Sequence, residues 1–234
     1  MFIGHYGAGF AGKKIDNQPS LGTMFFAAQF LDLLWPIFIL LGIEKVKIEP
    51  GLMAANPLDF TFYPYTHSLF FTVIWGILFG AVYFLVRKNI KGSILLGSLV
   101  LSHWVLDLIV HRPDLPIFPW SDLKVGLGLW NSVPVSFILE VLIFSTGAFF
   151  YISATKAKNK TGNFALWGLI IFLLVIYIAN VFGSAPPSVE AIGIAGLSQW
   201  IIIAWAYWIN KNRENIKENI VAKGEIRDAE SSTA

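Results

Sequence analysis

Long runs of apolar residues, separated by short polar segments, dominate the pattern along this chain. A membrane-spanning helix requires about 20 predominantly apolar residues. Six runs satisfy this requirement, at residues 21–43, 67–86, 93–111, 132–154, 164–183 and 189–209. The pattern therefore predicts an all-α polytopic membrane protein, a bundle of about six transmembrane helices that forms a single domain over residues 1–210.

The segments between these runs are short, with two exceptions. Residues 44–66 and 112–131 are rich in Pro, Asp, Gly and aromatic residues, a composition that suits ordered loops at the membrane interface. The last segment, 211–234, is polar and charged, and we expect it to be a cytoplasmic tail.

The first residues alternate between bulky apolar side chains and glycine. Gly4, Gly7, Gly9 and Gly12 are spaced through this segment, and small residues allow helices to approach closely in lipid. We therefore expect a short N-terminal re-entrant helix, which would carry His5 down towards the first transmembrane helix. If this segment is not re-entrant, His5 is a surface residue.

Composition supports the membrane assignment. Hydrophobic residues make up 56% of the 234 residues and charged residues 14%, whereas soluble domains carry roughly 25% charged residues. The absence of cysteine excludes disulfides and thiolate metal sites. A net charge of +2 gives no reason to expect a nucleic-acid partner.

The distribution of Lys and Arg predicts the orientation, because cytoplasmic loops carry an excess of these residues. With the N-terminus inside, 13 of the 17 basic residues fall on the cytoplasmic side. Lys45, Lys47, Arg112 and Lys124 fall on the other side. We therefore expect an integral protein of a bacterial inner membrane with both termini in the cytoplasm.

Polar side chains recur at helical spacing inside the third apolar run. His103, Asp107 and His111 are four residues apart, so in an α-helix they share one face. Asp32 lies inside the first run and Glu140 inside the fourth. An ionisable group in the hydrocarbon costs about 2.5 to 3.5 kcal/mol on insertion scales and usually faces the interior of the bundle.

These carboxylates have no Lys or Arg near them in the predicted helices, so they require protons or a metal ion. Neutral imidazole and carboxylate are common ligands of zinc. Simpler roles compete for each residue. A lone His often bonds across helices, Glu140 would suit a protonated structural carboxyl, and Asp32 precedes Pro36, which frees the Asp32 carbonyl. The clustering of these residues favours a metal site.

The roles assigned to individual residues follow from their positions. We expect Asp107 and Glu140 to be catalytic, with Glu140 either a ligand or the general base for a bound water. The candidate metal ligands are His5, Asp32, His67, His103, Asp107, His111 and Glu140. The candidate substrate-binding residues are Tyr65, Asp114, Lys124 and Asn131, although Asn131 would equally suit a helix cap.

The order His5, Asp32, His67, His103-x3-Asp107-x3-His111 and Glu140 resembles the bacterial inner-membrane proteins classed as membrane-bound metal-dependent hydrolases. These are distantly similar to the zinc-dependent phospholipase C and P1 nuclease group. The resemblance covers residues 1–140 and implies direct ligands at Asp32, His67, His103 and Asp107, with His5, His111 and Glu140 as further ligands. It implies one to three divalent ions, zinc above all, although this chain lacks the later His pair of the soluble group.

The resemblance implies a hydrolase that acts on a phosphoester or lipid-linked substrate through a metal-activated water. Transport is the main alternative, because buried Asp, His and Glu also form ion or proton pathways. A third alternative is a membrane scaffold in which a metal ion only ties helices together. The sequence leaves the substrate, the metal and the oligomeric state open.

Overall fold

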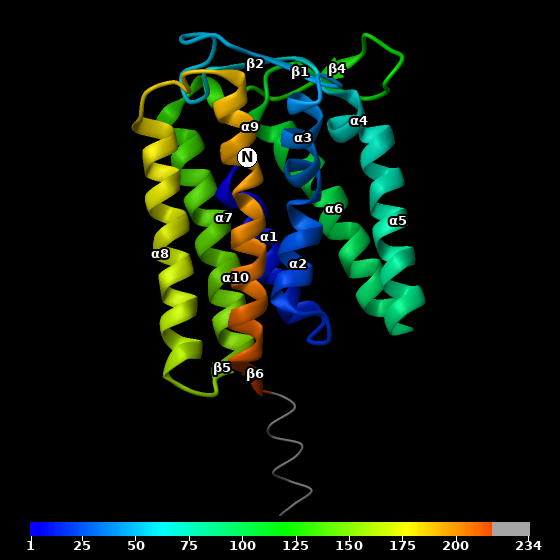
Figure 1. Ribbon diagram of the computed structural model, residues 1–234, viewed down its shortest axis with the longest axis vertical. Helices are drawn as coiled ribbons and strands as arrows, with labels where there is room; N and C mark the ends of the chain where they lie inside the picture. Colours follow the sequence, from blue (N-terminus) through cyan, green and yellow to red (C-terminus); the bar gives the residue numbers. More distant parts are fainter. Residues whose placement is uncertain (217–234) are drawn as a thin grey trace, which may run out of the picture.

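The computed structural model describes residues 1–216 and is a bundle of helices with small strands at both ends (Figure 1). The helices are α1 (Ile3–Ile15), α2 (Leu21–Ala28), α3 (Phe30–Leu40), α4 (Pro64–His67), α5 (Leu69–Arg87), α6 (Ile90–Val110), α7 (Val133–Ala154), α8 (Lys160–Phe182), α9 (Val189–Leu197) and α10 (Gln199–Lys211). The strands are β1 (Lys45–Ile48), β2 (Leu58–Phe62), β3 (Leu115–Pro116), β4 (Lys124–Val125), β5 (Thr155–Ala157) and β6 (Arg213–Asn215), with a 3-10 turn, η1, at Leu129–Asn131.

Five segments within the described residues are long and apolar enough to cross a membrane. They are α5, α6, α7, α8 and the combined segment α9–α10. The bent pair α2–α3 makes a sixth if it is taken as one span. The prediction of an all-α membrane protein with about six spans is therefore confirmed.

The first span bends by 55° between α2 and α3, at Gln29. The bend precedes Pro36, the residue that the sequence singled out. Pro36 lies inside α3 and has no N–H to donate to the carbonyl four residues earlier. The side chain of Gln199 on α10 donates to this Asp32 carbonyl instead, at 3.3 Å.

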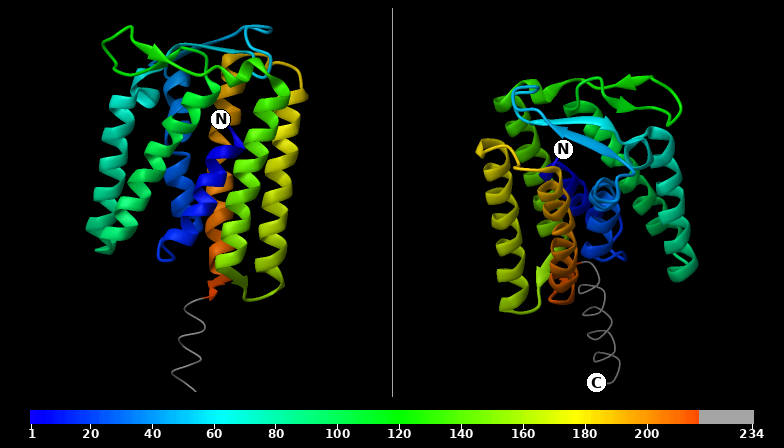
Figure 2. Two further views of the ribbon diagram at one scale, coloured as in Figure 1. Left: turned by 180° about the vertical axis from the view of Figure 1, so that it is seen from behind. Right: turned by 45° about the horizontal axis from the view of Figure 1, so that its top comes forward.

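Helix α1 lies buried in the centre of the bundle, where it packs most extensively against α7 (Figure 2). Glycines make this contact close. A Cβ built on Gly7 would lie 2.7 Å from the carbonyl oxygen of Ile143, and one on Gly147 would lie 2.8 Å from the Gly7 Cα. The expected re-entrant helix is thus an interior helix of 13 residues.

The hairpin β1–β2 and the pair β3–β4 lie at the same end of the bundle (Figure 2). The two connections are tied together, because the Ala55 N–H donates to the Trp130 carbonyl at 2.9 Å. These are the loops 44–66 and 112–131, which the sequence indicates to be ordered.

The opposite end is closed by β5 and β6, which pair antiparallel. The buried guanidinium of Arg213 donates to the carbonyl and the hydroxyl of Thr155, at 2.9 and 3.0 Å. The polar segment therefore does not leave the bundle at residue 211, as the sequence suggested, because residues 213–215 form a strand. Residues 217–234 of the predicted tail lie outside the described residues.

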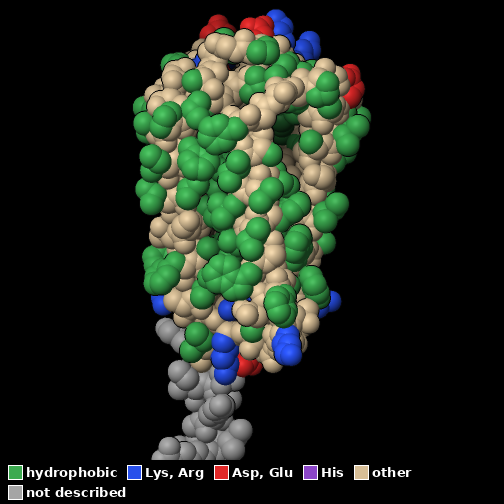
Figure 3. All heavy atoms as spheres, turned by 90° about the vertical axis from the view of Figure 1, so that its left-hand side faces the viewer, with side chains coloured by type: hydrophobic (Ala, Val, Ile, Leu, Met, Phe, Trp, Pro, Cys, Tyr) green, Lys and Arg blue, Asp and Glu red, His purple; other side chains and the backbone are tan. Residues whose placement is uncertain are grey.

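Apolar side chains cover the middle of the face that carries α8, and charged side chains are confined to its two ends (Figure 3). The exposed side chains of α8 include Ile171, Val175, Ile178 and Phe182. In water this surface would be unfavourable, whereas in a bilayer it faces acyl chains.

Candidate metal centre

Five side chains from four helices converge near the end of the bundle that carries the β1–β2 hairpin. We call them the His/Asp cluster: His5 (α1), Asp32 (α3), His67 (α4), His103 and Asp107 (α6). They form two overlapping groups, His5–His103–Asp107 and Asp32–His67–His103, and within each group the candidate ligand atoms lie within 4.8 Å of one another. This spacing would allow a single ion to bind all members of a group.

The two carboxylates face the imidazoles directly. Nε2 of His103 lies 3.3 Å from Asp107 Oδ2 and 3.6 Å from Asp32 Oδ1. Nε2 of His67 lies 3.4 Å from Asp32 Oδ1 and 3.8 Å from Asp107 Oδ2. Asp107 also turns its other oxygen, Oδ1, towards His5 Nε2, at 3.1 Å. Asp107 therefore contacts both groups through different oxygens.

The backbone of α2 determines which nitrogen of His103 is free. Nδ1 lies 2.8 Å from the Ala28 carbonyl oxygen, and because a carbonyl only accepts, Nδ1 carries the hydrogen. Nε2 then holds a lone pair. This atom is buried and has no hydrogen-bond partner among the described residues, an arrangement that suits a metal ligand.

A chain of three side chains determines which ring nitrogen of His67 carries the hydrogen. The Thr66 hydroxyl donates to Glu44 Oε2 at 2.6 Å, and its oxygen lies 2.7 Å from His67 Nδ1. The hydroxyl has one hydrogen, so when it donates to Glu44 it accepts from His67 Nδ1–H. Nε2 of His67 is thus left as a lone pair that faces Asp32.

Glu44 is almost fully buried and holds α4 as well. Its Oε1 accepts from the backbone N–H groups of Tyr65 and Thr66, at 2.8 and 2.9 Å. Burial raises the pKa of this carboxyl, and the hydrogen bonds from Thr66 oppose that rise. Glu44 is not among the predicted site residues. The next helix, α5, is capped by Ser68, whose hydroxyl accepts from Phe71 N–H at 3.2 Å.

His5 reaches the cluster from α1. Its ring stacks on that of His103, with centroids 3.6 Å apart and planes at 7°. The amino group of Met1 also contacts Asp107 Oδ1. The expectation that no basic group of the protein faces the carboxylates therefore needs correction at Asp107. Asp32 has only imidazole partners among the ion pairs of the described residues.

Glu140 lies beside the cluster but belongs to neither group. Its Oε2 accepts from the backbone N–H groups of Phe2 and Gly4, at 2.7 and 3.3 Å. These are unpaired donors at the start of α1, where a carboxylate is favoured by the helix dipole. The contacts give Glu140 a structural role next to the catalytic one that the sequence suggested.

His111 also lies outside both groups and pairs with a carboxylate. Its Nδ1 lies 2.9 Å from Asp114 Oδ1, and the Tyr63 hydroxyl lies 3.4 Å from both of these atoms. Arg112 pairs with Asp114 at 3.1 Å and with Asp59. The structure thus brings together five of the seven predicted ligands and separates His111 and Glu140 from them.

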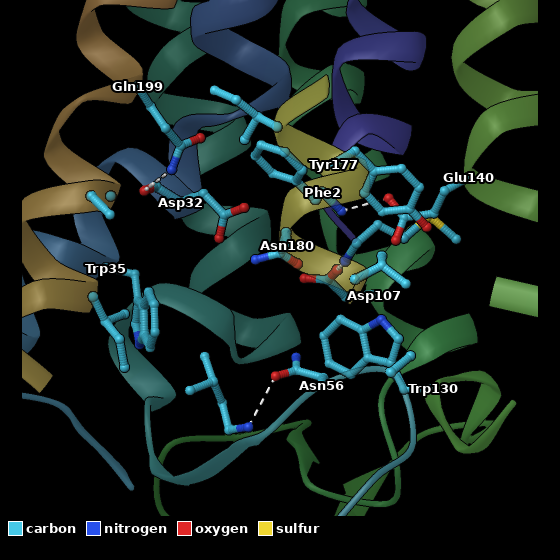
Figure 4. Close-up of a pocket in the computed structure, with 18 of the residues that line it drawn as sticks. Phe2, Asp32, Trp35, Asn56, Asp107, Trp130, Glu140, Tyr177, Asn180 and Gln199 are labelled. Atoms are coloured by element: carbon cyan, nitrogen blue, oxygen red, sulfur yellow. Dashed lines mark hydrogen bonds and ion pairs between the residues drawn. The ribbon is translucent and has the colours of Figure 1, made fainter. Parts of the chain in front are cut away.

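A cavity of about 380 Å³ extends from the cluster towards α8 and α9 (Figure 4). Asp32, His67, Asp107, His111 and Glu140 contribute to its wall. None of the predicted substrate-binding residues does. Asp114 pairs with His111, whereas Tyr65, Lys124 and Asn131 are exposed elsewhere at this end.

The cavity contains polar residues that are not among the predicted site residues. Asn56, Asn180 and Gln199 line it together with Trp35 and Trp130 (Figure 4). Asn180 and Gln199 had a recognisable signal, because each is an amide within an otherwise apolar run. Asn56 lies in a polar loop and had none.

The comparisons with known proteins give one match. No curated protein and no solved structure matches this chain. A family model described as YdjM inner membrane protein matches residues 49–184, more than half of the chain. The matched range includes His67, His103, Asp107, His111 and Glu140, and it excludes His5 and Asp32. The chain is therefore an integral inner-membrane protein, and it belongs to the YdjM inner membrane protein family.

Proposed function

We propose that the protein is a metal-dependent hydrolase of the inner membrane, with zinc as its ion and a phosphoester or lipid-linked molecule as its substrate. One observation carries the proposal: the Nε2 atoms of His67 and His103 both face the carboxylates of Asp32 and Asp107. Neutral imidazoles and carboxylates in this arrangement form the donor set that zinc prefers.

The hydrogen bonds behind these donors support the fit. Metal-binding histidines almost always donate their other ring N–H to a carboxylate, a backbone carbonyl or a water molecule. His103 donates to the Ala28 carbonyl. His67 donates to the Thr66 hydroxyl, which in turn donates to the Glu44 carboxylate. A divalent ion held here would supply Lewis acidity and lower the pKa of a water molecule towards neutrality.

Asp107 is the residue best placed to hold two ions. Its Oδ1 faces His5 and its Oδ2 faces His67 and His103, at 3.1, 3.8 and 3.3 Å. Asp32, which the sequence suggested as a bridging ligand, turns the same oxygen, Oδ1, to both His67 and His103. Asp107 would therefore be the carboxylate that serves both groups of candidate ligands, and its Oδ1 also contacts the Met1 amino group.

His111 would be the general base that takes a proton from the bound water. The Asp114 carboxylate accepts from His111 Nδ1–H, which leaves Nε2 as a base on the ring that lines the cavity. This arrangement, in which a carboxylate orients a histidine, is typical of general acid–base catalysis. Glu140 remains the second candidate for that task, in competition with its hydrogen bonds to the start of α1.

The test is to purify the protein, measure bound zinc by elemental analysis and assay release of phosphate or a head group from phospholipids. We expect His103→Ala and Asp107→Ala to lose both zinc and activity. Asp122→Ala is the matched control, because Asp122 is an exposed carboxylate at the same end of the bundle. Zinc content equal to that of the wild type in both cluster variants would rule out this metal site.

Transport is the second candidate, and the break in the first span favours it. This span bends by 55° at Gln29, and Asp32, which follows the bend, lines the cavity together with Gln199. Broken helices beside a buried polar site are typical of secondary transporters. Zinc flux into liposomes by a protein that hydrolyses no lipid would support transport over hydrolysis.

A further inference from the structure

In the cavity beside the His/Asp cluster, the described residues that form the exposed part of the wall lie on one side. Almost all the residues in its wall are buried or half-buried, and three are exposed: Asn180 on α8, Ala195 on α9 and Ser198 between α9 and α10. The loop 183–188 joins α8 to α9, while α8 packs against α10 further along the bundle. The three exposed residues therefore mark an opening between α8 and α9, which we call the mouth.

The aqueous end of the cavity is covered. Asn56 and Leu58, from the loop and strand of the β1–β2 connection, form part of its wall. The Ala55 N–H donates to the Trp130 carbonyl at 2.9 Å. The rings of Phe60 and Trp130 stack with centroids 6.2 Å apart. These contacts hold the two outer connections together over the cluster, so access from the side is easier than access from above.

The surface around the mouth is apolar. Ile178 and Phe182 on α8 are 47% and 66% exposed, and Ile194 on α9 is 66% exposed. Figure 3 shows that apolar side chains cover the middle of the molecule on the side that carries α8. In the membrane this face contacts acyl chains, so the mouth opens towards lipid.

The wall of the cavity changes in character from the mouth to the cluster. The apolar residues Ile176, Val181 and Ile192 lie on α8 and α9, the helices that border the mouth. The acidic residues of the wall, Asp32, Asp107 and Glu140 (Figure 4), come from α3, α6 and α7. The described residues of the wall include no Lys or Arg, and the amino group of Met1, which also lines the cavity, is paired with Asp107. Because that amino group is already paired, an anionic group at the inner end would depend on a bound cation for its charge balance, and an acyl chain would suit the outer end.

We propose that the cavity takes a phosphate-bearing lipid sideways from the bilayer, through the opening between α8 and α9. The phosphate would lie at the His/Asp cluster, and the amides of Asn180 and Gln199 line the path between cluster and mouth. A volume of about 380 Å³ is within the usual range for a small-molecule site; it holds the polar part of the lipid while the chains remain in the bilayer. The phosphate contact rests on the proposed metal site, whereas the lateral opening does not.

The experiment measures lipid retention, which is independent of hydrolysis. Zinc-loaded protein in detergent micelles is mixed with phosphatidic acid, with diacylglycerol or with inorganic phosphate alone, and bound molecules are counted by native mass spectrometry. We expect retention of phosphatidic acid above both others. Ala195→Trp would fill the mouth and reduce this retention by about tenfold or more, which corresponds to about 1.4 kcal/mol. Ile194→Trp is the matched control, because its side chain is exposed on the same helix but does not line the cavity.

A second pair of variants approaches the mouth from α8. Asn180→Phe should also reduce retention, and Ile178→Phe should not, since Ile178 is exposed and outside the cavity wall. Equal retention in Ala195→Trp, Asn180→Phe and the wild type would overturn the proposal, as would a wild-type protein that retains no phosphatidic acid. A protein that binds no zinc but whose lipid retention still depends on Ala195 and Asn180 would refute the hydrolase and support the lateral opening.

Discussion

The hydroxyl oxygen of Thr66 lies 2.7 Å from Nδ1 of the neighbouring His67, and the same hydroxyl donates to Glu44 at 2.6 Å. All three side chains are buried. A single hydroxyl thus links a carboxylate in the loop before β1 to an imidazole of the His/Asp cluster. This link fixes the tautomer of His67 in which Nε2 is free to bind a metal ion.

Removal of the Thr66 hydroxyl should therefore weaken metal binding, without creating a cavity in the core. We expect Thr66→Val to lower zinc affinity by about 10- to 100-fold, the usual cost of losing a hydrogen bond behind a metal ligand. Thr66→Ser should restore it, because serine keeps the hydroxyl. Competition with a chelating dye would measure the affinity. Thr72→Val is the matched control, since within residues 1–216 the buried Thr72 hydroxyl bonds only to the Ser68 carbonyl. A similar loss of zinc affinity in that variant would contradict a specific role for the Thr66 hydroxyl.

His111 and His103 should respond differently to substitution. His111 pairs with Asp114 and belongs to neither group of candidate ligands, so we expect His111→Ala to keep bound zinc and to lose hydrolysis. His103→Ala should lose both. Zinc content and phosphate release would be measured on the same preparations. Loss of zinc from His111→Ala would restore His111 to the ligand set that the sequence suggested.

The sequence was sufficient for the spans and for most of the cluster. Apolar runs predict membrane helices because lipid requires every backbone group to be satisfied within the segment. The i, i+4 spacing placed His103 and Asp107 on one face of α6. The tertiary contacts could not be predicted in the same way. The spacing predicts that His111 is a ligand like His103, because it assumes that the helix continues. However, α6 ends at Val110, and His111 adopts an extended backbone with φ −62° and ψ 144°. This change turns its ring to Asp114.

The contacts of Gln199 and Glu44 show a second limit of the sequence. Pro36 indicates that the Asp32 carbonyl lacks its helical partner, but nothing in the sequence identifies Gln199, 167 residues away, as the replacement. Glu44 stands at the end of an apolar run and has the appearance of an interfacial charge. Only the folded chain brings it against Thr66.

The close contact of α1 with α7 should tolerate no side chain at Gly147. A Cβ there would meet the backbone of Gly7, with its Cα at 2.8 Å. Overpacking of this kind costs about 1–3 kcal/mol, so Gly147→Val should lower the melting temperature. It should also lower zinc content, because α1 carries His5. Gly168→Ala is the control, since the nearest atom to its Cβ would be the Trp205 ring at 3.3 Å. Equal melting temperatures for the two variants would show that α1 is not held by this contact.

The orientation in the membrane decides which compartment the cluster faces. The cavity adjoins the β1–β2 end of the bundle, and the distribution of basic residues predicts that this end faces away from the cytoplasm. The chain has no cysteine, so single cysteines can report on each end. Lys124 and Lys160 are exposed at opposite ends. We expect Lys124→Cys to react with a membrane-impermeant maleimide in spheroplasts, and Lys160→Cys to react only after lysis. The reverse result would place the cluster at the cytoplasmic side, and the substrate would then have to come from the inner leaflet.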